Sequence, residues 1–187
     1  MENPINAKDF WSHFATELRK EYNSNKSFIK YYLDDKQLTR FFTDFLIKLV
    51  QFNYKLSCYQ KEHWPRVDVS FFDQENEEWG TWAYEIAIEI ENNINTWHEE
   101  VCKLLIINSG LKILITYYND KNYIDKELKK FKSVYKSRKY HQVNENWLFI
   151  FGPCADGTWD NNDWLAYSFD GESLDDITDG YNIFLNN

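Results

Sequence analysis

Residues 81–117, TWAYEIAIEIENNINTWHEEVCKLLIINSGLKILITY, predict a strand, a helix and a second strand. Apolar residues alternate with small or acidic residues from Thr81 to Glu91, which is the pattern of a strand. Thr96 to Asn108 places its apolar residues at helical spacing, and Leu111 to Tyr117 is an apolar strand. Two strands joined through a helix are expected to lie parallel, with a right-handed crossover. The segment therefore predicts a βαβ unit.

The predicted helix carries signals at both of its ends. Thr96 can cap the N-terminus, and Glu99 stands three residues later, where a capping box has its acid. Gly110 fits just past the C-terminus, where a left-handed residue commonly ends a helix. We therefore expect a helix that begins at Thr96 and ends shortly before Gly110.

Further elements are predicted on both sides of this unit. Helices are expected at Ala7–Tyr22, Lys36–Asn53 and Asp120–Arg138, and strands at Leu56–Lys61, Arg66–Asp73, Trp147–Phe151 and Trp164–Phe169. The order α, α, β, β, β, α, β, α, β, β predicts a mixed central β-sheet flanked by helices, of the α/β or α+β class. No repeat or linker interrupts it, so we expect residues 1–187 to form a single domain.

The composition indicates a packed protein. Hydrophobic residues make up 43% and aromatic residues 19% of the 187 residues, which suits one domain with a sizeable core. No run of about 18 apolar residues predicts a membrane span, and no secretory signal is recognisable. Cys58, Cys102 and Cys154 lie far apart, which argues against a disulfide framework. We therefore expect a cytoplasmic protein without membrane association.

The charge is strongly acidic but unevenly spread. The net charge of −9 opposes non-specific attraction to nucleic acid, which depends on lysine and arginine. Residues 121–139 nevertheless hold eight Lys or Arg against two acids, whereas residues 154–187 hold eight acids and no Lys or Arg. The acidic C-terminal region could cover the basic helix within the molecule or bind a basic partner.

Three acids are predicted to meet on neighbouring strands. Glu89 and Glu91 are two residues apart and so share one face of their strand, together with the small residue Ala87. Asp68 lies on the strand before it. Carboxylates so close repel each other unless a cation or a proton intervenes, and a divalent cation such as Mg²⁺ or Mn²⁺ would satisfy them. The alternative is a hairpin whose wet face carries ordinary solvated acids.

Lys103 is the residue that favours a functional site over a solvent-exposed face of ordinary acids. It lies away from the main apolar stripe of its helix, beside Ile106 and Ile107, so its stem can cross apolar surface and bring its ammonium toward the acids. There the ammonium could orient an attacking water or offset charge on a phosphate. The alternative is a surface ion pair with Glu99, four residues earlier.

These residues resemble the PD-(D/E)XK nuclease superfamily, the restriction-endonuclease-like fold. The resemblance rests on Asp68, on Glu89 in the run IEIENN, on the segments WHEEVCKLL and LKILITYY, and on an αβββαβ order over about residues 36–118. Glu91 stands where the usual motif has lysine, so the chain resembles members whose lysine has moved to the following helix. The N-terminal helix and the C-terminal helix and strands are additions to this core.

The resemblance implies an activity and a role for each residue. The activity is Mg²⁺- or Mn²⁺-dependent phosphodiester hydrolysis of DNA or RNA, by an endonuclease-like hydrolase. Asp68 and Glu89 would be metal ligands, Glu91 an additional ligand or positioning acid, and Lys103 the catalytic lysine.

The basic helix is the candidate nucleic-acid-binding element. Its side chains could follow a phosphate backbone, and Tyr123, Tyr135 and Tyr140 could stack on bases. The alternative is a solvated amphipathic helix whose tyrosines face the core. The candidate contacts are Lys129, Lys130, Lys132, Lys136, Arg138 and Lys139.

Two other functions compete with hydrolysis. The acidic charge favours a catalytically inactive nuclease-fold protein, with a binding or regulatory role, that engages a basic protein partner through its acidic surface. A homodimer formed through the aromatic-rich surface is the third interpretation.

Overall fold

Four helices and seven strands make up the part of the chain that the computed structural model describes, which is residues 5–24, 35–59, 67–72, 84–93, 95–138, 145–153 and 164–178. The helices are α1 (Ala7–Ser24), α3 (Asp35–Tyr54), α4 (Trp97–Ile106) and α5 (Lys121–Ser137). The strands are β1 (Ser57–Tyr59), β2 (Val69–Phe72), β3 (Tyr84–Ile90), β4 (Ser109–Tyr118), β5 (Asn146–Pro153), β6 (Leu165–Phe169) and β7 (Leu174–Asp176). Every predicted helix and strand is confirmed over the residues that the structure describes, and β7 is additional. Positions 60, 61, 66, 73 and 81–83 of the predicted strands lie outside the described residues.

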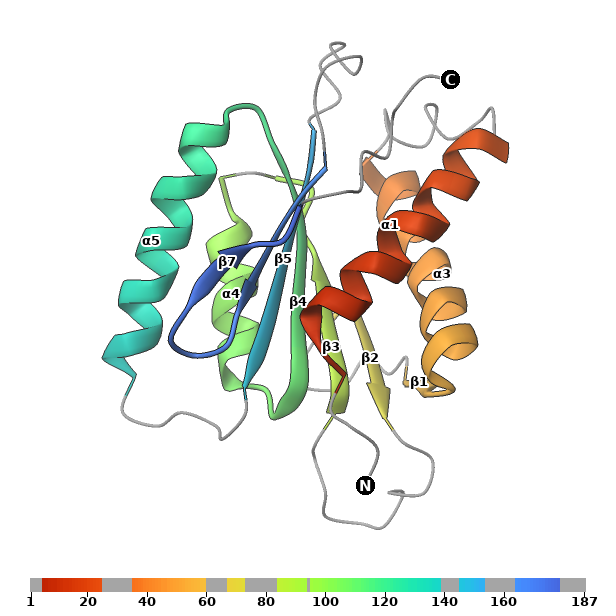
Figure 1. The fold of residues 1–187 in the computed structure, drawn as a ribbon, viewed down its shortest axis with the longest axis horizontal. Coiled ribbons are helices and arrows are strands. Elements are labelled where there is room, and N and C mark those ends of the chain that lie inside the picture. Colours follow the sequence, from red (N-terminus) through yellow and green to blue (C-terminus); the bar gives the residue numbers. More distant parts are fainter. Residues whose placement is uncertain are drawn as a thin grey trace.

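The strands form one mixed sheet in which spatial order follows sequence order, from β1 to β7 (Figure 1). Strands β3, β4 and β5 are parallel, and the pairs on either side of them are antiparallel. The predicted parallel pairing of β3 with β4 is therefore confirmed, and its register sets Glu89 opposite Leu114. The predicted mixed sheet flanked by helices is confirmed.

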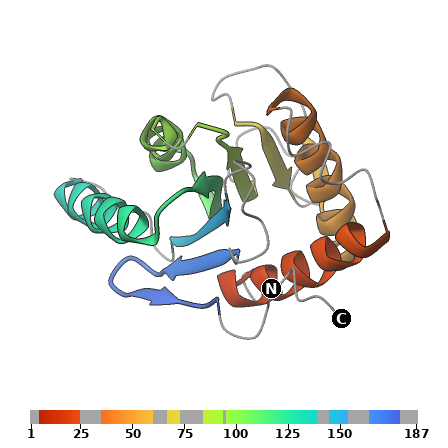
Figure 2. The same ribbon diagram turned by 90° about the horizontal axis from the view of Figure 1, so that it is seen from above.

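Helices cover both faces of the sheet, with α1 and α3 on one face and α4 and α5 on the other (Figure 2). Successive side chains of β3 point to opposite faces of the sheet, and this alternation decides which core each residue enters. Ile86, Ile88 and Ile90 enter the core under α1 and α3, whereas Ala87 enters the core under α4 and α5. Each fully buried isoleucine contributes roughly 1.5–3 kcal/mol of transfer free energy, so this register is strongly preferred.

The aromatic content is concentrated in both cores. On the α1 and α3 side, Trp164 packs against Phe14 and Phe42, with ring centroids 5.8 and 5.7 Å apart, and so joins the two helices to β6. On the other side, Phe131 of α5 packs against Phe149 of β5 at 4.8 Å. These contacts account for the abundance of aromatic residues as packing between layers.

The predicted capping of α4 is wrong in its details. Thr96 is the N-cap residue, but its side chain caps no helix N–H; its hydroxyl donates to the carbonyl of Asn93 at 3.3 Å. The helix ends at Ile106, its C-cap residue Ile107 is extended, and Gly110 is already the second residue of β4. The chain passes straight from helix to strand, so no left-handed glycine is needed; a Cβ at Gly110 would instead lie 3.3 Å from the carbonyl oxygen of Glu85.

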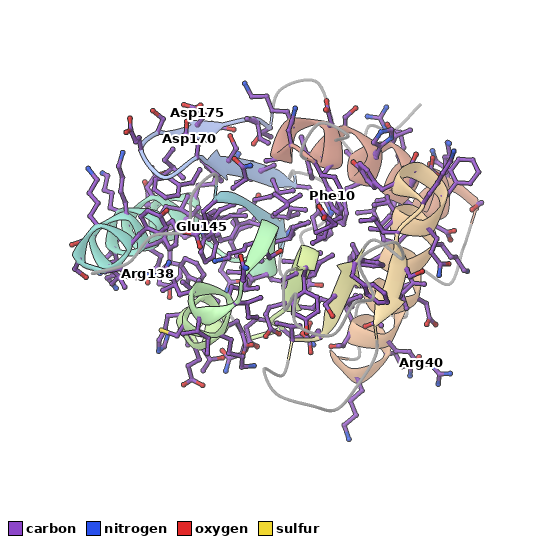
Figure 3. The ribbon with its side chains drawn as sticks, turned by 90° about the horizontal axis from the view of Figure 1, so that it is seen from below. Phe10, Arg40, Arg138, Glu145, Asp170 and Asp175 are labelled. Atoms are coloured by element: carbon purple, nitrogen blue, oxygen red, sulfur yellow. The ribbon has the colours of Figure 1, made fainter. Side chains whose placement is uncertain are left out.

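The described part of the acidic C-terminal region lies beside the basic helix. Phe169 of β6 packs edge-on against Tyr135 of α5, with centroids 4.8 Å apart. In the turn that follows, backbone N–H groups of Ser173 and Glu172 bond to Asp170 and, with a contribution from Lys132, hold the pKa of that carboxyl below its usual range. Both Asp170 and Asp175 mark this hairpin in Figure 3.

Among the described helices, none has the length and apolar character needed to cross a membrane.

Candidate functional site

Asp68 meets β3 at the point where the pairing of β2 with β3 ends. The regular pairing includes Val69 opposite Ile88. One step further, the carboxylate of Asp68 accepts the backbone N–H of Ile90 at 2.8 Å. The backbone N–H of Asp68 donates to Oε2 of Glu89 at 3.4 Å. Of the predicted strand, Arg66 lies outside the described residues, and β2 begins at Val69, because the Asp68 side chain takes over the hydrogen bond that the strand would have made.

Glu89 is a buried carboxyl without a full set of partners. Its side chain is 1% exposed and lies on the sheet face that α4 covers. Its Oε1 accepts no hydrogen bond among the described residues. Burial raises the pKa of Glu89 far above its usual range, the carboxylates of Asp68 and Glu100 raise it further, and Lys103 offsets only part of the rise. The raised pKa favours the protonated form of this carboxyl at neutral pH.

Lys103 reaches the two acids from α4. Its Nζ lies 3.8 Å from Oε1 of Glu89 and forms a closer ion pair with Glu100, three residues earlier on the same helix. Burial alone would lower the pKa of Lys103, but the hydrogen bond to Glu100 and the nearby carboxylates raise it overall. The partner on the helix is Glu100 rather than Glu99, which was the expected partner of a plain surface pair. The ammonium is therefore held at the acids.

Glu91 is directed elsewhere. It follows the last residue of β3, and its carboxylate accepts the backbone N–H of Asn93 at 2.6 Å. Its own backbone N–H donates to Ile115 of β4 at 2.9 Å. Over the residues that the structure describes, no three His, Cys, Asp or Glu side chains lie close enough together to hold a metal ion. The structure thus brings Asp68, Glu89 and Lys103 together and leaves Glu91 bonded to its own turn.

The arrangement has a definite chemical capacity. A buried protonated carboxyl beside an ionisable one can exchange its proton for a divalent cation, since the cation satisfies both oxygens at once. Asp68 and Glu89 are the residues that would hold such a cation, and their oxygens are the hard ligands that Mg²⁺ and Mn²⁺ prefer. The ammonium of Lys103 adds a positive charge 3.8 Å from Glu89. A bound cation and the ammonium of Lys103 would together stabilise an anionic substrate electrostatically.

Glu100 is the residue of the site that sequence reasoning missed. Its side chain is 13% exposed, and its charge acts on both Glu89 and Lys103. The signal that could have found it is its spacing, since residues three apart on a helix are neighbours.

The basic helix lies apart from these acids. Figures 1 and 2 show α4 between α5 and β2. The candidate contacts Lys129, Lys130 and Lys136 are exposed, Lys132 is half-buried and Lys139 lies outside the described residues. Tyr135 faces the core, as the alternative interpretation of this helix expected, Tyr123 is half-buried and Tyr140 is outside the described residues.

Arg138 is turned inward, away from the exposed lysines. Its guanidinium donates to the carbonyl of Leu105 and lies 3.4 Å from Glu145 (Figure 3). Glu145 also pairs with Lys112, which is fully buried 5.1 Å from the ring centre of Trp147. Burial lowers the pKa of Lys112, and the Glu145 partner offsets part of that effect. This second ionic cluster ties the end of α5 to β4 and β5.

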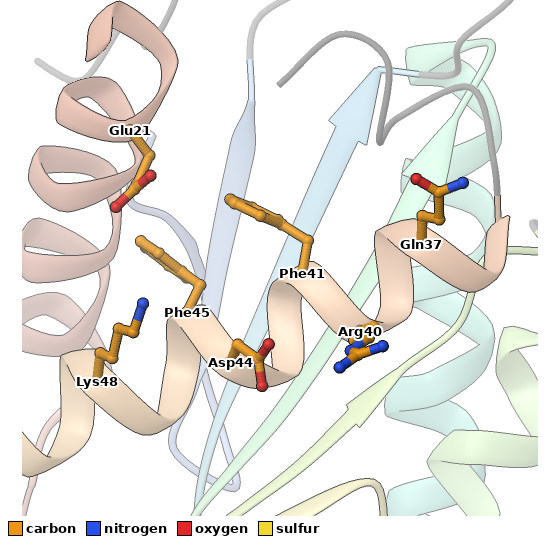
Figure 4. Close-up of a pocket in the computed structure, with 7 residues that line it drawn as sticks. All are labelled: Glu21, Gln37, Arg40, Phe41, Asp44, Phe45 and Lys48. Carbon is orange, nitrogen blue, oxygen red and sulfur yellow. The ribbon is translucent and has the colours of Figure 1, made fainter. Parts of the chain in front are cut away.

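A groove between α1 and α3 lies on the opposite side of the sheet. In Figure 4, Glu21 extends from α1 toward Phe45 and Lys48 of α3. Neither Asp68, Glu89 nor Lys103 lines this groove. We therefore place the candidate site at the edge of α4, where β2 and β3 meet.

Comparison with known proteins gave no further assignment: no protein-family model matches the sequence, and no curated protein is significantly similar to it.

Proposed function

We propose that the protein is a metal-dependent phosphodiester hydrolase, nuclease-like, that acts on DNA or RNA. The observation that carries this proposal is the convergence of Asp68, Glu89 and Lys103 from three separate elements. Asp68 and Glu89 are 21 positions apart in the chain, and Lys103 arrives from a helix beyond both of them.

The order of elements supports the same proposal. From α3 to β4 the chain runs α, β, β, β, α, β, with Asp68 just before β2, Glu89 on β3 and Lys103 on α4. This is the arrangement implied by the resemblance to the PD-(D/E)XK superfamily in the variant whose lysine is on the helix. The fold-level likeness is an analogy, so the function rests on the site itself.

Each residue has a role in this proposal. Asp68 and Glu89 would hold Mg²⁺ or Mn²⁺, which supplies Lewis-acid chemistry when bound. To hold the cation, Glu89 would have to be ionised, so it would release its proton to solvent on binding. Glu91 remains a candidate for an additional ligand, for which its carboxylate would have to leave the N–H of Asn93. Lys103 would hold the attacking water or the scissile phosphate and offset negative charge that develops there.

The test is cleavage of single- and double-stranded DNA and RNA by the purified protein with Mg²⁺, Mn²⁺ or EDTA. We expect cleavage only with a divalent cation, and a loss of at least about 100-fold in Asp68→Asn, Glu89→Gln and Lys103→Met. Asp68→Asn keeps an oxygen for the N–H of Ile90, so it tests chemistry rather than folding. Glu99→Gln, an exposed acid on the same helix, is the matched control and should cleave normally. Equal cleavage in all variants would mean that this site is not responsible.

The binding-protein alternative is favoured by the net charge of −9. Such a protein would show no divalent-cation binding in calorimetry and would bind a basic protein through its acidic surface. Calorimetric titration of the wild type with Mn²⁺ therefore separates the two functions before any substrate is known.

A further inference from the structure

Lys103 is shared unequally between two carboxylates. It forms a close ion pair with Glu100, whereas its Nζ stays 3.8 Å from Oε1 of Glu89, beyond hydrogen-bond distance. Oε1 of Glu89 consequently accepts no hydrogen bond among the described residues, although its side chain is almost fully buried. A buried carboxyl oxygen beside an ammonium would ordinarily accept a hydrogen bond from it, since a hydrogen bond to a charged group contributes about 1.5–3 kcal/mol.

Glu100 is placed to prevent that closure. Glu100 and Lys103 are three residues apart on the flank of α4, next to the apolar stripe that packs on the sheet. Glu100 is largely buried there, whereas the adjacent Glu99 is exposed. A largely buried acid needs a partner, and Lys103 is the cation that it holds.

We propose that Glu100 is a positioning residue, which holds the ammonium of Lys103 beside Glu89 without letting it close on Oε1, and so keeps that oxygen open to a divalent cation. The inference rests on the proposed function for the identity of the ligand. Without Glu100, the ammonium would occupy Oε1 of Glu89 and compete with the cation. With Glu100, Lys103 and the cation can act at the same time on an anionic substrate.

The first arm of the test needs neither cation nor substrate. Crystal structures of the wild type, Glu100→Gln and the matched control Glu99→Gln are determined in EDTA. We expect the ammonium of Lys103 to lie within hydrogen-bond distance of Oε1 of Glu89 in Glu100→Gln alone. An ammonium that keeps its wild-type position in Glu100→Gln, or turns to solvent, overturns the inference.

The second arm measures Mn²⁺ affinity by calorimetry. Glu100→Gln should weaken binding by about 10-fold, because the cation must displace an ammonium, and Glu99→Gln should change it little. In a Lys103→Met background the same Glu100→Gln change should have no further effect, since no ammonium remains to compete. If Glu100→Gln weakens binding equally in both backgrounds, Glu100 is a ligand, and the positioning role is overturned.

The two arms separate this inference from the proposed function. If the wild type binds no Mn²⁺ and cleaves nothing, the proposed function fails. The part of the inference that reserves Oε1 of Glu89 for a cation then fails too. The EDTA structures still decide whether Glu100 restrains Lys103. If the wild type binds Mn²⁺ and cleaves, but Lys103 is unmoved in Glu100→Gln, only the positioning role fails.

Discussion

At the scale of the residue, Glu89 is the group whose ionisation the fold controls most strongly. It lies on the face of β3 that α4 covers, because its neighbours Ile88 and Ile90 point to the opposite face and pack in the core under α1 and α3. Burial and the carboxylates of Asp68 and Glu100 then raise its pKa. The same packing that places the acid at the site therefore makes its charged form unfavourable, which the cation of the proposed function would offset.

The first prediction concerns stability against pH without cation. The folded state keeps the Glu89 proton at pH values where the unfolded chain, with a glutamate pKa of about 4.3, has lost it. Its contribution to the free energy of unfolding is therefore fully present below about pH 4.3 and falls as pH rises, by at most about 1.4 kcal/mol per pH unit.

Glu89→Gln removes this dependence while preserving the shape of the side chain. In urea denaturation with EDTA, we expect the variant to gain stability relative to the wild type from about pH 5 to about pH 8. Mn²⁺ should narrow the difference, because the cation replaces the proton and stabilises the wild type. Parallel profiles for the two proteins would contradict the prediction.

At the scale of the element, the junction of α5, β4 and β5 depends on a buried ionic cluster. Lys112 of β4 pairs with Glu145, which directly precedes β5, and Arg138 at the end of α5 is the second cation on Glu145. Tyr135 also bonds to Glu145. The cluster has one acid and two cations, so removing the acid should cost more stability than removing one of the cations.

The second prediction follows from that inequality. Glu145→Gln leaves the buried Lys112 without its carboxylate and should cost about 3–5 kcal/mol of the free energy of unfolding. Lys112→Met leaves Glu145 paired with Arg138 and should cost clearly less. Chemical denaturation of both variants checks the order, and an equal or reversed order would show that Arg138 is no substitute partner.

At the scale of the whole molecule, the charge distribution decides how an anionic substrate could approach. The net charge is −9, and the candidate site itself contains three acids to one lysine. Helix α5, which carries the exposed lysines, lies on the far side of α4 from β2. They could contact a nucleic acid only at a distance from the scissile bond, so they would contribute to binding rather than to chemistry.

The third prediction tests this division of labour. Replacing Lys129, Lys130 and Lys136 by glutamine should raise KM, leave kcat nearly unchanged and reduce the slope of affinity against salt by about 2–3. The control replaces three exposed lysines of the α1 and α3 layer, Lys8, Lys20 and Lys48. Both triple variants change the net charge equally, so equal effects on KM would mean that only the overall charge matters.

The sequence by itself determined the helices, every described strand except β7, and the mixed sheet, because apolar periodicity is a local property that burial enforces. It also singled out Asp68, Glu89 and Lys103, since the period of two on β3 and the flank of α4 could be counted along the chain. Only the tertiary structure decided the partners: Glu100 rather than Glu99 for Lys103, and the turn at Asn93 for Glu91. The pairing of Lys112 with Glu145 likewise depends on strand register across 33 positions. Such contacts are set by the packing of elements distant in sequence, which no local pattern encodes.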